Sequence, residues 1–146
     1  MSEGKLRKAV KKASGFAFSL LPPLRRVMAQ GLSVFVFNDV TDKPSRFAEE
    51  FDLAVTPEVF RRQVSWIKKQ FNVIHPADIL NKSPMPSCAA MISFDDGFLG
   101  AFENGLPILK EMGIPSIIFL NMRAILENRP IASAAACFLS RYNPDF

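Results

Sequence analysis

The stretch Met91-Ile92-Ser93-Phe94-Asp95-Asp96-Gly97 decides how this chain folds and where its chemistry lies. An apolar run that begins at Cys88 stops at Phe94, and two adjacent carboxylates and a glycine follow it. A short apolar run bounded by turn residues predicts a buried strand. Two carboxylates at the end of such a strand lose hydration and repel each other unless a metal or a proton offsets their charge. We therefore expect this corner to be a functional site.

Apolar strands alternate with helical segments on both sides of the corner. Thr56-Pro57-Glu58 is a helix start, with Thr as N-cap and Pro in the first turn. The predicted helices are 57–70, 76–80, a segment ending near Met112, and 132–139. The predicted strands are 32–37, 71–74, 88–94 and 116–121, and residues 38–54 are predicted to be a loop. This order predicts an α/β chain with parallel βαβ units, in which catalytic groups lie at the carboxyl ends of strands.

The basic residues concentrate in an N-terminal arm. Residues 1–26 carry seven Lys/Arg against one acidic residue, whereas the remainder carries 11 basic and 13 acidic residues. We expect a basic helical arm over 1–30 and one domain over 31–146. In residues 5–26 basic residues flank an apolar run. We expect a solvated helix that leads into the domain, and peripheral contact with an anionic membrane surface is the alternative. Nucleic-acid binding is not expected, because no basic, aromatic-interleaved face continues into the domain.

The length, the composition and the cysteines limit which class of protein this chain can be. A chain of 146 residues with 49% hydrophobic residues suits a single domain with its own core. Cys88 and Cys137 lack metal-site spacing, which favours reduced, buried thiols. We therefore expect a cytoplasmic location or one at the cytosolic face of a membrane.

Two interpretations of the carboxylate pair follow from the residues alone. In metal-assisted hydrolysis one carboxylate binds a divalent cation and the other takes a proton from water, while Gly97 lets the backbone turn. In the alternative, Asp95 or Asp96 caps the following helix by accepting its backbone N–H groups. A phosphatase of the haloacid-dehalogenase type is disfavoured, because its nucleophilic Asp position is Ser93 here.

Three segments together resemble the polysaccharide deacetylase family (NodB homology domain, carbohydrate esterase family 4). They are Ser93-Phe94-Asp95-Asp96-Gly97, Leu106-Pro107-Ile108-Leu109-Lys110 and Gly113-Ile114-Pro115-Ser116. Upstream, 56–60, 63–67 and 75–80 are similar to the segment that precedes the corner in many members. The resemblance covers residues 32–121 and is most specific over 93–120.

The resemblance implies a distorted (β/α) barrel, of which this chain would hold the N-terminal half. It implies that Asp95 is the catalytic base and that Asp96 is a ligand of Zn²⁺ or another divalent metal. A His-x-x-x-His motif further along the family's chains completes that site. The implied reaction is hydrolysis of a non-peptide carbon–nitrogen bond, which removes an acyl group from an amino sugar in an N-acetylated carbohydrate.

The sequence departs from the family pattern in its histidines. Its only histidine is His75, upstream of the corner, and no His-x-x-x-His follows Asp96. A lone His before a Pro is expected to be a surface or capping residue. Asn38 stands where many members have a histidine, and Ser93 replaces the usual threonine. A catalytic zinc site normally has three protein ligands, whereas this pattern supplies one carboxylate ligand.

Two explanations of this gap remain open. The chain is either an N-terminal fragment of a longer deacetylase, or a degenerate member that acts as a non-catalytic carbohydrate-binding or scaffolding module. In both cases we expect the isolated chain to be inactive. The sequence gives no indication of its oligomeric state.

Overall fold

The computed structural model describes the backbone of residues 31–142 and the side chains of residues 31–139. The expected basic arm lies outside the described residues. The elements, in chain order, are β1 (Leu32–Phe37), β2 (Asp39–Val40), α3 (Arg46–Glu50), β3 (Ala54–Val55), α4 (Pro57–Gln70), β4 (Asn72–Val73), α5 (Pro76–Leu80), β5 (Ala89–Asp95), η1 (Ala101–Gly105), α6 (Leu106–Glu111), β6 (Ser116–Phe119), α7 (Met122–Leu126) and α8 (Ala132–Tyr142).

Strand β5 is the centre of a four-stranded parallel sheet. It pairs with β1 along one edge, from Leu32 opposite Ala89 to Phe37 opposite Phe94. Along its other edge it pairs with β4 near its start and with β6 near its end, where Asp95 lies opposite Phe119. A separate pair, β2 and β3, lies beyond the end of β1. The predicted α/β class with parallel strands is therefore confirmed, and the strand that ends at the two aspartates is its central one.

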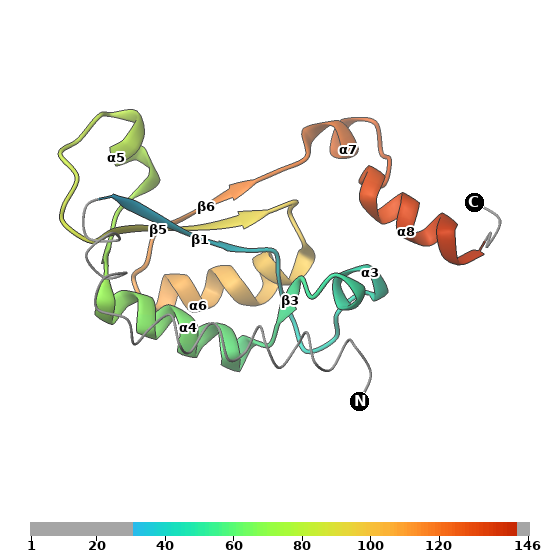
Figure 1. Cartoon of the computed structure of the whole chain (residues 1–146), viewed down its shortest axis with the longest axis horizontal. Coiled ribbons are helices and arrows are strands. Elements are labelled where there is room, and N and C mark those ends of the chain that lie inside the picture. The colour runs from blue at the N-terminus through green and yellow to red at the C-terminus, as the bar shows by residue number, and fades with distance from the viewer. Residues whose placement is uncertain (1–30, 143–146) are drawn as a thin grey trace.

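The two faces of this sheet differ. Alternate residues of β5 point to opposite faces, and Ala90, Ile92 and Phe94 belong to the hydrophobic core. Helices α4 and α6 cover that face (Figure 1). The opposite face carries Ser93 and Asp95, and neither helix lies on it.

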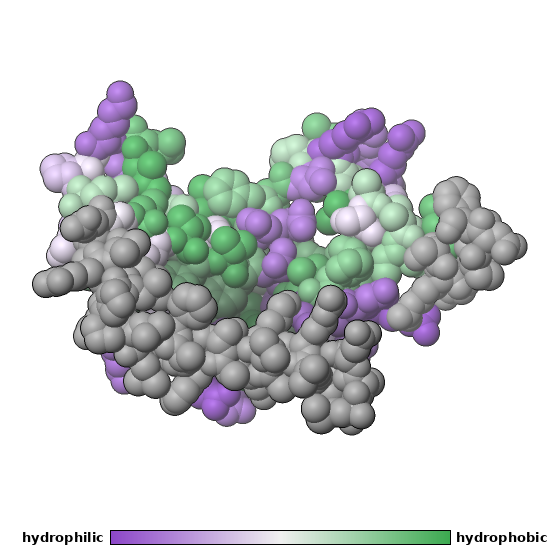
Figure 2. All heavy atoms as spheres, in the orientation of Figure 1, coloured by the Kyte–Doolittle hydropathy of each residue, from purple (hydrophilic) through white to green (hydrophobic). Residues whose placement is uncertain are grey.

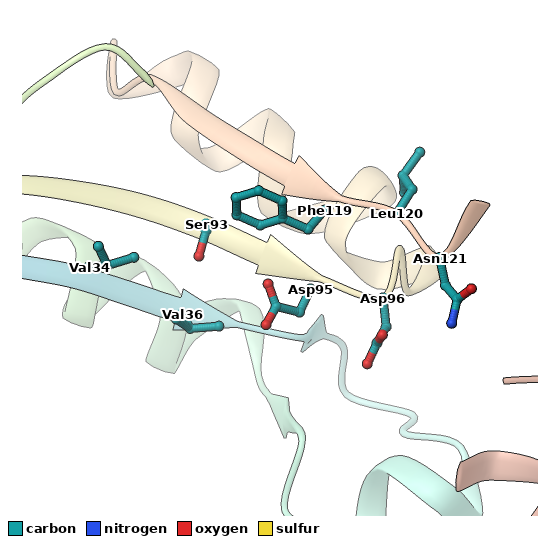
Figure 3. A pocket seen from close by; sticks show the side chains of 8 residues that line it. All are labelled: Val34, Val36, Ser93, Asp95, Asp96, Phe119, Leu120 and Asn121. Carbon is teal, nitrogen blue, oxygen red and sulfur yellow. The ribbon is translucent and has the colours of Figure 1, made fainter. Parts of the chain in front are cut away.

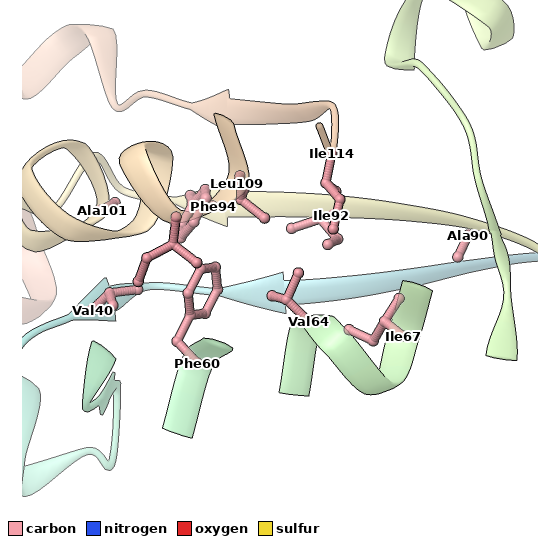
Figure 4. Packing of buried hydrophobic residues seen from close by; sticks show 11 residues of the cluster. Val40, Phe60, Val64, Ile67, Ala90, Ile92, Phe94, Ala101, Leu109 and Ile114 are labelled. Atoms are coloured by element: carbon pink, nitrogen blue, oxygen red, sulfur yellow. The ribbon is translucent and has the colours of Figure 1, made fainter. Parts of the chain in front are cut away.

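Helix α4 shows how local sequence and packing agree. The Thr56 hydroxyl accepts a hydrogen bond from the Val59 backbone N–H (3.2 Å), and Pro57 occupies the first turn, so the helix begins where the sequence predicts. Its buried residues, Phe60, Val64 and Ile67, follow helical spacing. Figure 4 shows these side chains pointing toward the central strand, and the Phe60 ring lies 5.7 Å from that of Phe94.

Several sequence-based expectations need correction. The predicted loop 38–54 contains β2 and α3, because Ser45 caps a short helix that no apolar periodicity announces. A barrel is not shown, because the strands of residues 31–142 form an open sheet, as a partial barrel would. Cys88 and Cys137 form no disulfide within the described residues, and both are only partly buried rather than buried as expected. No helix in the described part of the chain is both long and apolar enough to cross a membrane.

Candidate functional site

The corner after β5 is a tight left-handed turn. Asp96 has φ +64° and Gly97 has φ +70°, so two successive residues lie in the left-handed region. Asp is one of the few non-glycine side chains that tolerate this conformation. A Cβ on Gly97 would lie 2.6 Å from Leu120 Cδ2, so that position needs glycine for both its φ and its close approach to the chain after β6.

The two carboxylates of the corner have no structural task within the described residues. Asp95 is partly buried and lies over the open sheet face, whereas Asp96 is exposed and projects beyond the strand end (Figure 3). No described residue donates a hydrogen bond to either carboxylate or forms an ion pair with one. The first residues of η1 also receive no side-chain cap. The capping interpretation of the pair is therefore wrong, and both carboxylates are available for chemistry.

An open depression of about 520 Å³ lies beside these carboxylates. Its lining residues come from the ends of three neighbouring strands: Val34, Val36, Ser93, Asp95, Asp96, Phe119, Leu120 and Asn121. In Figure 3 the side chains of Val36, Ser93 and Asp95 share the open face of the sheet. The depression combines an apolar floor with a polar rim, a composition typical of small-molecule sites.

Sequence reasoning missed Asn121 at the rim of this depression. Its side-chain oxygen accepts a hydrogen bond from the Ala124 backbone N–H (3.3 Å) and caps α7. The sequence did contain a pattern that predicts this position: Asn121 is the first polar residue after the apolar β6 run, at the same end of the sheet as Asp95.

A third acid, Asp39, lies against Gly100, three residues after the corner, and was not predicted as a site residue. It is 6% exposed, and its Oδ1 has no hydrogen-bond partner. Burial raises the pKa of Asp39, although the backbone amides of Val40 and Gly100 act in the opposite direction. A Cβ on Gly100 would collide with Asp39 Oδ1. Nearby, the Asn104 side-chain amide donates to the Val40 carbonyl (2.8 Å), so β2 holds the start of the helix that follows the corner.

The described residues do not fit a complete catalytic metal site. No group of three or more His, Cys, Asp and Glu side chains within residues 31–139 could hold a metal ion. His75 caps the N-terminus of α5. Its Nδ1 accepts a hydrogen bond from the Ala77 backbone N–H (3.1 Å), and the Asp78 carboxylate accepts one from the His75 backbone N–H (3.0 Å). The expectation that His75 is a surface or capping residue is confirmed.

Comparison with known proteins identifies the fold. No protein-family model and no curated protein match the sequence. Among solved structures, IcaB from Ammonifex degensii matches 62% of this chain with a TM-score of 0.52 and 24% identity. A de-N-acetylase from Aggregatibacter actinomycetemcomitans matches 60% of this chain with a TM-score of 0.51 and 22% identity. BC0361, a polysaccharide deacetylase from Bacillus cereus, matches with a TM-score of 0.43, which is too low to support an argument.

These matches confirm the resemblance to polysaccharide deacetylases at the level of the fold. The chain spans only 38% and 36% of the lengths of the first two matched chains. The matched structures are therefore much longer than the region that they share with this chain.

Proposed function

We propose that this chain provides the base-bearing part of a carbohydrate de-N-acetylase site. The observation that supports the proposal is the pair Asp95 and Asp96: two carboxylates at the carboxyl end of the central parallel strand that no described residue engages. Parallel α/β proteins place their catalytic groups at that end of the sheet. The fold shared with the A. actinomycetemcomitans de-N-acetylase supports the choice of reaction.

The two carboxylates have different roles in this proposal. Asp95 lies over the open face, beside the depression, and accepts a proton from the attacking water. Asp96 projects past the strand end and offers one carboxylate to a divalent metal, Zn²⁺ by family resemblance. The remaining metal donors lie outside the described residues. The substrate is an amino sugar carrying an N-acyl group, and the bond cleaved is its non-peptide carbon–nitrogen bond.

The first test separates ligand binding from turnover. We expect an N-acetylglucosamine oligomer, titrated into the ¹⁵N-labelled chain, to shift the amide signals of Ser93, Asp95, Phe119 and Asn121. Asp42→Asn, an exposed change outside the depression, is the matched control and should leave these shifts unchanged. Shifts confined to other parts of the chain, or no shifts at saturating sugar, would contradict the site.

The second test concerns the missing donors. With Zn²⁺ added, the isolated chain should release no acetate from the same oligomer, because one or two carboxylates hold a metal too weakly for catalysis. Robust acetate release that disappears in Asp95→Asn would show instead that this chain completes the site by itself.

A second candidate function follows from the same donor count. Because the described residues lack a metal-binding cluster, the chain suits a degenerate member that binds carbohydrate or serves as a scaffold without catalysis. Sugar binding that Asp95→Asn and Asp96→Asn leave unchanged would favour this module, since a binding surface does not depend on a general base.

A further inference from the structure

A second groove lies between the outer edge of β1 and helix α4. It has a volume of about 740 Å³ and shares only Val36 of its lining with the depression beside the corner. Its lining is mostly apolar and consists of Phe35, Val36, Phe37, Arg62, Gln63, Trp66 and Ile67. Among the described residues β1 pairs with β5 alone, so this edge of the sheet has no neighbour there. The groove is therefore a site separate from the one that Asp95 lines.

Trp66 leaves apolar surface exposed in this groove. Its side chain is 43% exposed, although it lies in a helix that packs against the sheet. Its ring meets that of Phe71 edge-on, with 5.9 Å between the ring centroids. Figure 2 shows apolar side chains gathered over the part of the molecule where β1 runs in Figure 1. A partly exposed indole in an apolar groove is typical of a surface that binds a further apolar segment.

The chain itself contains an apolar segment that suits this groove. Residues 16–21 read Phe-Ala-Phe-Ser-Leu-Leu, and they belong to the N-terminal arm, outside the described residues. Three large side chains, those of Phe16, Phe18 and Leu20, are separated by single small residues. Transfer of such side chains from water to an apolar environment is favourable, and the groove supplies that environment.

The run at residues 16–21 is close enough along the chain to reach the groove. The arm joins the described part of the chain at β1, which starts at Leu32. Phe35 and Phe37 lie about 10 and about 17 Å further along this strand, at a rise of about 3.3 Å per residue. Residues 22–30, between the run and β1, can span up to about 30 Å. A tether this short gives an effective concentration on the order of millimolar, so even a weak contact is populated.

Charge favours an arm that turns back antiparallel to β1. Residues 5–12 carry five Lys/Arg and no acidic residue. Beyond the end of β1 lie β2, α3, β3 and the start of α4 (Figure 1). Residues 42–58 there carry Lys43 and Arg46 against five exposed acidic residues, Asp42, Glu49, Glu50, Asp52 and Glu58. With residues 16–21 in the groove, an antiparallel arm brings its basic stretch toward this acid-rich segment, where opposite charges attract.

We propose that residues 16–21 of the N-terminal arm pack into the groove between β1 and α4 and cover Trp66, with residues 5–12 along the acid-rich segment 42–58. A second copy of the chain or a lipid surface would have to compete with this tethered segment. The contact does not involve the corner carboxylates, so it stands apart from the proposed reaction.

Trp66 reports on this contact, because it is the sole tryptophan of the chain. In the full 146-residue chain, Phe18→Asp should release the run and shift the Trp66 emission to longer wavelength. It should also raise the acrylamide quenching constant at least about twofold, because a covered indole is shielded from the quencher. Leu80→Asp is the matched control: Leu80 is 83% exposed on α5, lies outside the groove, and its replacement should change neither measurement. Both variants should keep the circular dichroism spectrum of the parent chain.

The charged half of the contact has its own test. The double change Lys11→Glu and Lys12→Glu should raise the Trp66 quenching constant at low salt. The parent chain and this variant should converge as salt rises to about 1 M, where the Debye length is about 3 Å. No rise at low salt would overturn the placement of residues 5–12.

A photo-reactive p-benzoylphenylalanine in place of Phe18 identifies what the run touches. Irradiation should give an intramolecular cross-link to a peptide that contains residues 35–37 or Trp66, found by mass spectrometry of the monomer. This measurement keeps an aromatic side chain in the run, so it remains decisive even if Phe18→Asp does not fold.

Three results would overturn the proposal. The first is a Trp66 quenching constant that Phe18→Asp leaves unchanged, or that Leu80→Asp raises equally. The second is a cross-link that joins two copies, which would make a second copy the occupant of the groove. The third is a cross-link to another part of the chain, or one to lipid alone when vesicles of phosphatidylserine and phosphatidylcholine are present. Because none of these measurements uses enzyme activity, a failure here is distinct from a failure of the proposed reaction.

Discussion

Replacing Asp39 by Asn tests whether a buried acid beside Gly100 lowers the stability of the chain. Asp39 is 6% exposed, and its Oδ1 has no hydrogen-bond partner. Burial raises its pKa, against the opposing effect of the amides of Val40 and Gly100. The Asn side chain has nearly the same size but cannot ionise, so Asp39→Asn removes the charge and leaves the packing in place.

The sign of the effect follows from the direction of the pKa shift. A raised pKa means that the folded chain holds this proton to a higher pH than the unfolded chain, whose Asp titrates near about 3.9. Below that pH both states are protonated and the charge has no effect. As pH rises through the raised folded pKa, the folded state loses stability, and this loss persists at neutral pH. An unsatisfied buried charge costs more than an unsatisfied neutral polar group, and Asn keeps a buried polar side chain while removing the charge. Asp39→Asn should therefore stabilise the chain near neutrality by on the order of 1 kcal/mol.

Urea unfolding followed by circular dichroism measures this difference. The stability gap between Asp39→Asn and the parent chain should open between about pH 3 and about pH 7, whereas all other carboxylates cancel in the comparison. Asp42→Asn, at an exposed site three residues away, is the control and should open no gap. A parent chain more stable than Asp39→Asn at neutral pH would refute the reasoning, because it would show that the carboxylate has a stabilising partner.

Three further changes probe the corner and its surroundings by thermal or urea unfolding. Gly97→Ala should destabilise by about 1–3 kcal/mol, because its φ is +70° and its Cβ would meet Leu120; adding Leu120→Ala should relieve only the steric part. Asp96→Gly should stabilise by about 1 kcal/mol, since glycine adopts φ +64° without strain, and a loss would mean that the side chain has a structural role. His75→Ala should lower the free energy of unfolding by about 0.5–2 kcal/mol, because it removes the cap on the Ala77 N–H. It should leave the Zn²⁺ affinity unchanged, and weaker zinc binding would identify His75 as a ligand.

Local patterns in the sequence were sufficient for the central elements. Strand β1 and helix α4 begin and end where they were predicted, because apolar spacing and the Thr56 cap act within a few residues. Gly113 follows the helical segment that was predicted to end near Met112, and its φ of +64° is a conformation that favours glycine. The apolar run that stops at Phe94 predicted that Asp95 and Asp96 lie at the end of a strand, and the structure agrees.

The remaining features depend on contacts between distant segments. Asp39 is buried because β2 lies against η1. The residues around it in the sequence are polar and predict a loop, so its burial could not be predicted locally. The π-helical turn at Ala101–Gly105 precedes α6, and the sequence predicted only where this helical segment ends. The sequence also does not predict the open sheet face. Val34 and Val36 have the pattern of core residues, but within residues 31–139 no side chains bury them.

Three features that lower the stability of this chain lie on one side of the molecule. Asp96 adopts a left-handed conformation, no described residue pairs with either corner carboxylate, and the apolar side chains of Val34, Val36 and Phe119 stay roughly half exposed. The helix-covered face shows the opposite pattern, with a closely packed aromatic and aliphatic core. Strain and unsatisfied groups concentrate at functional sites, where selection for activity opposes selection for stability. Because all three meet at the end of β5, the corner is the part of the described chain where a functional site is best supported.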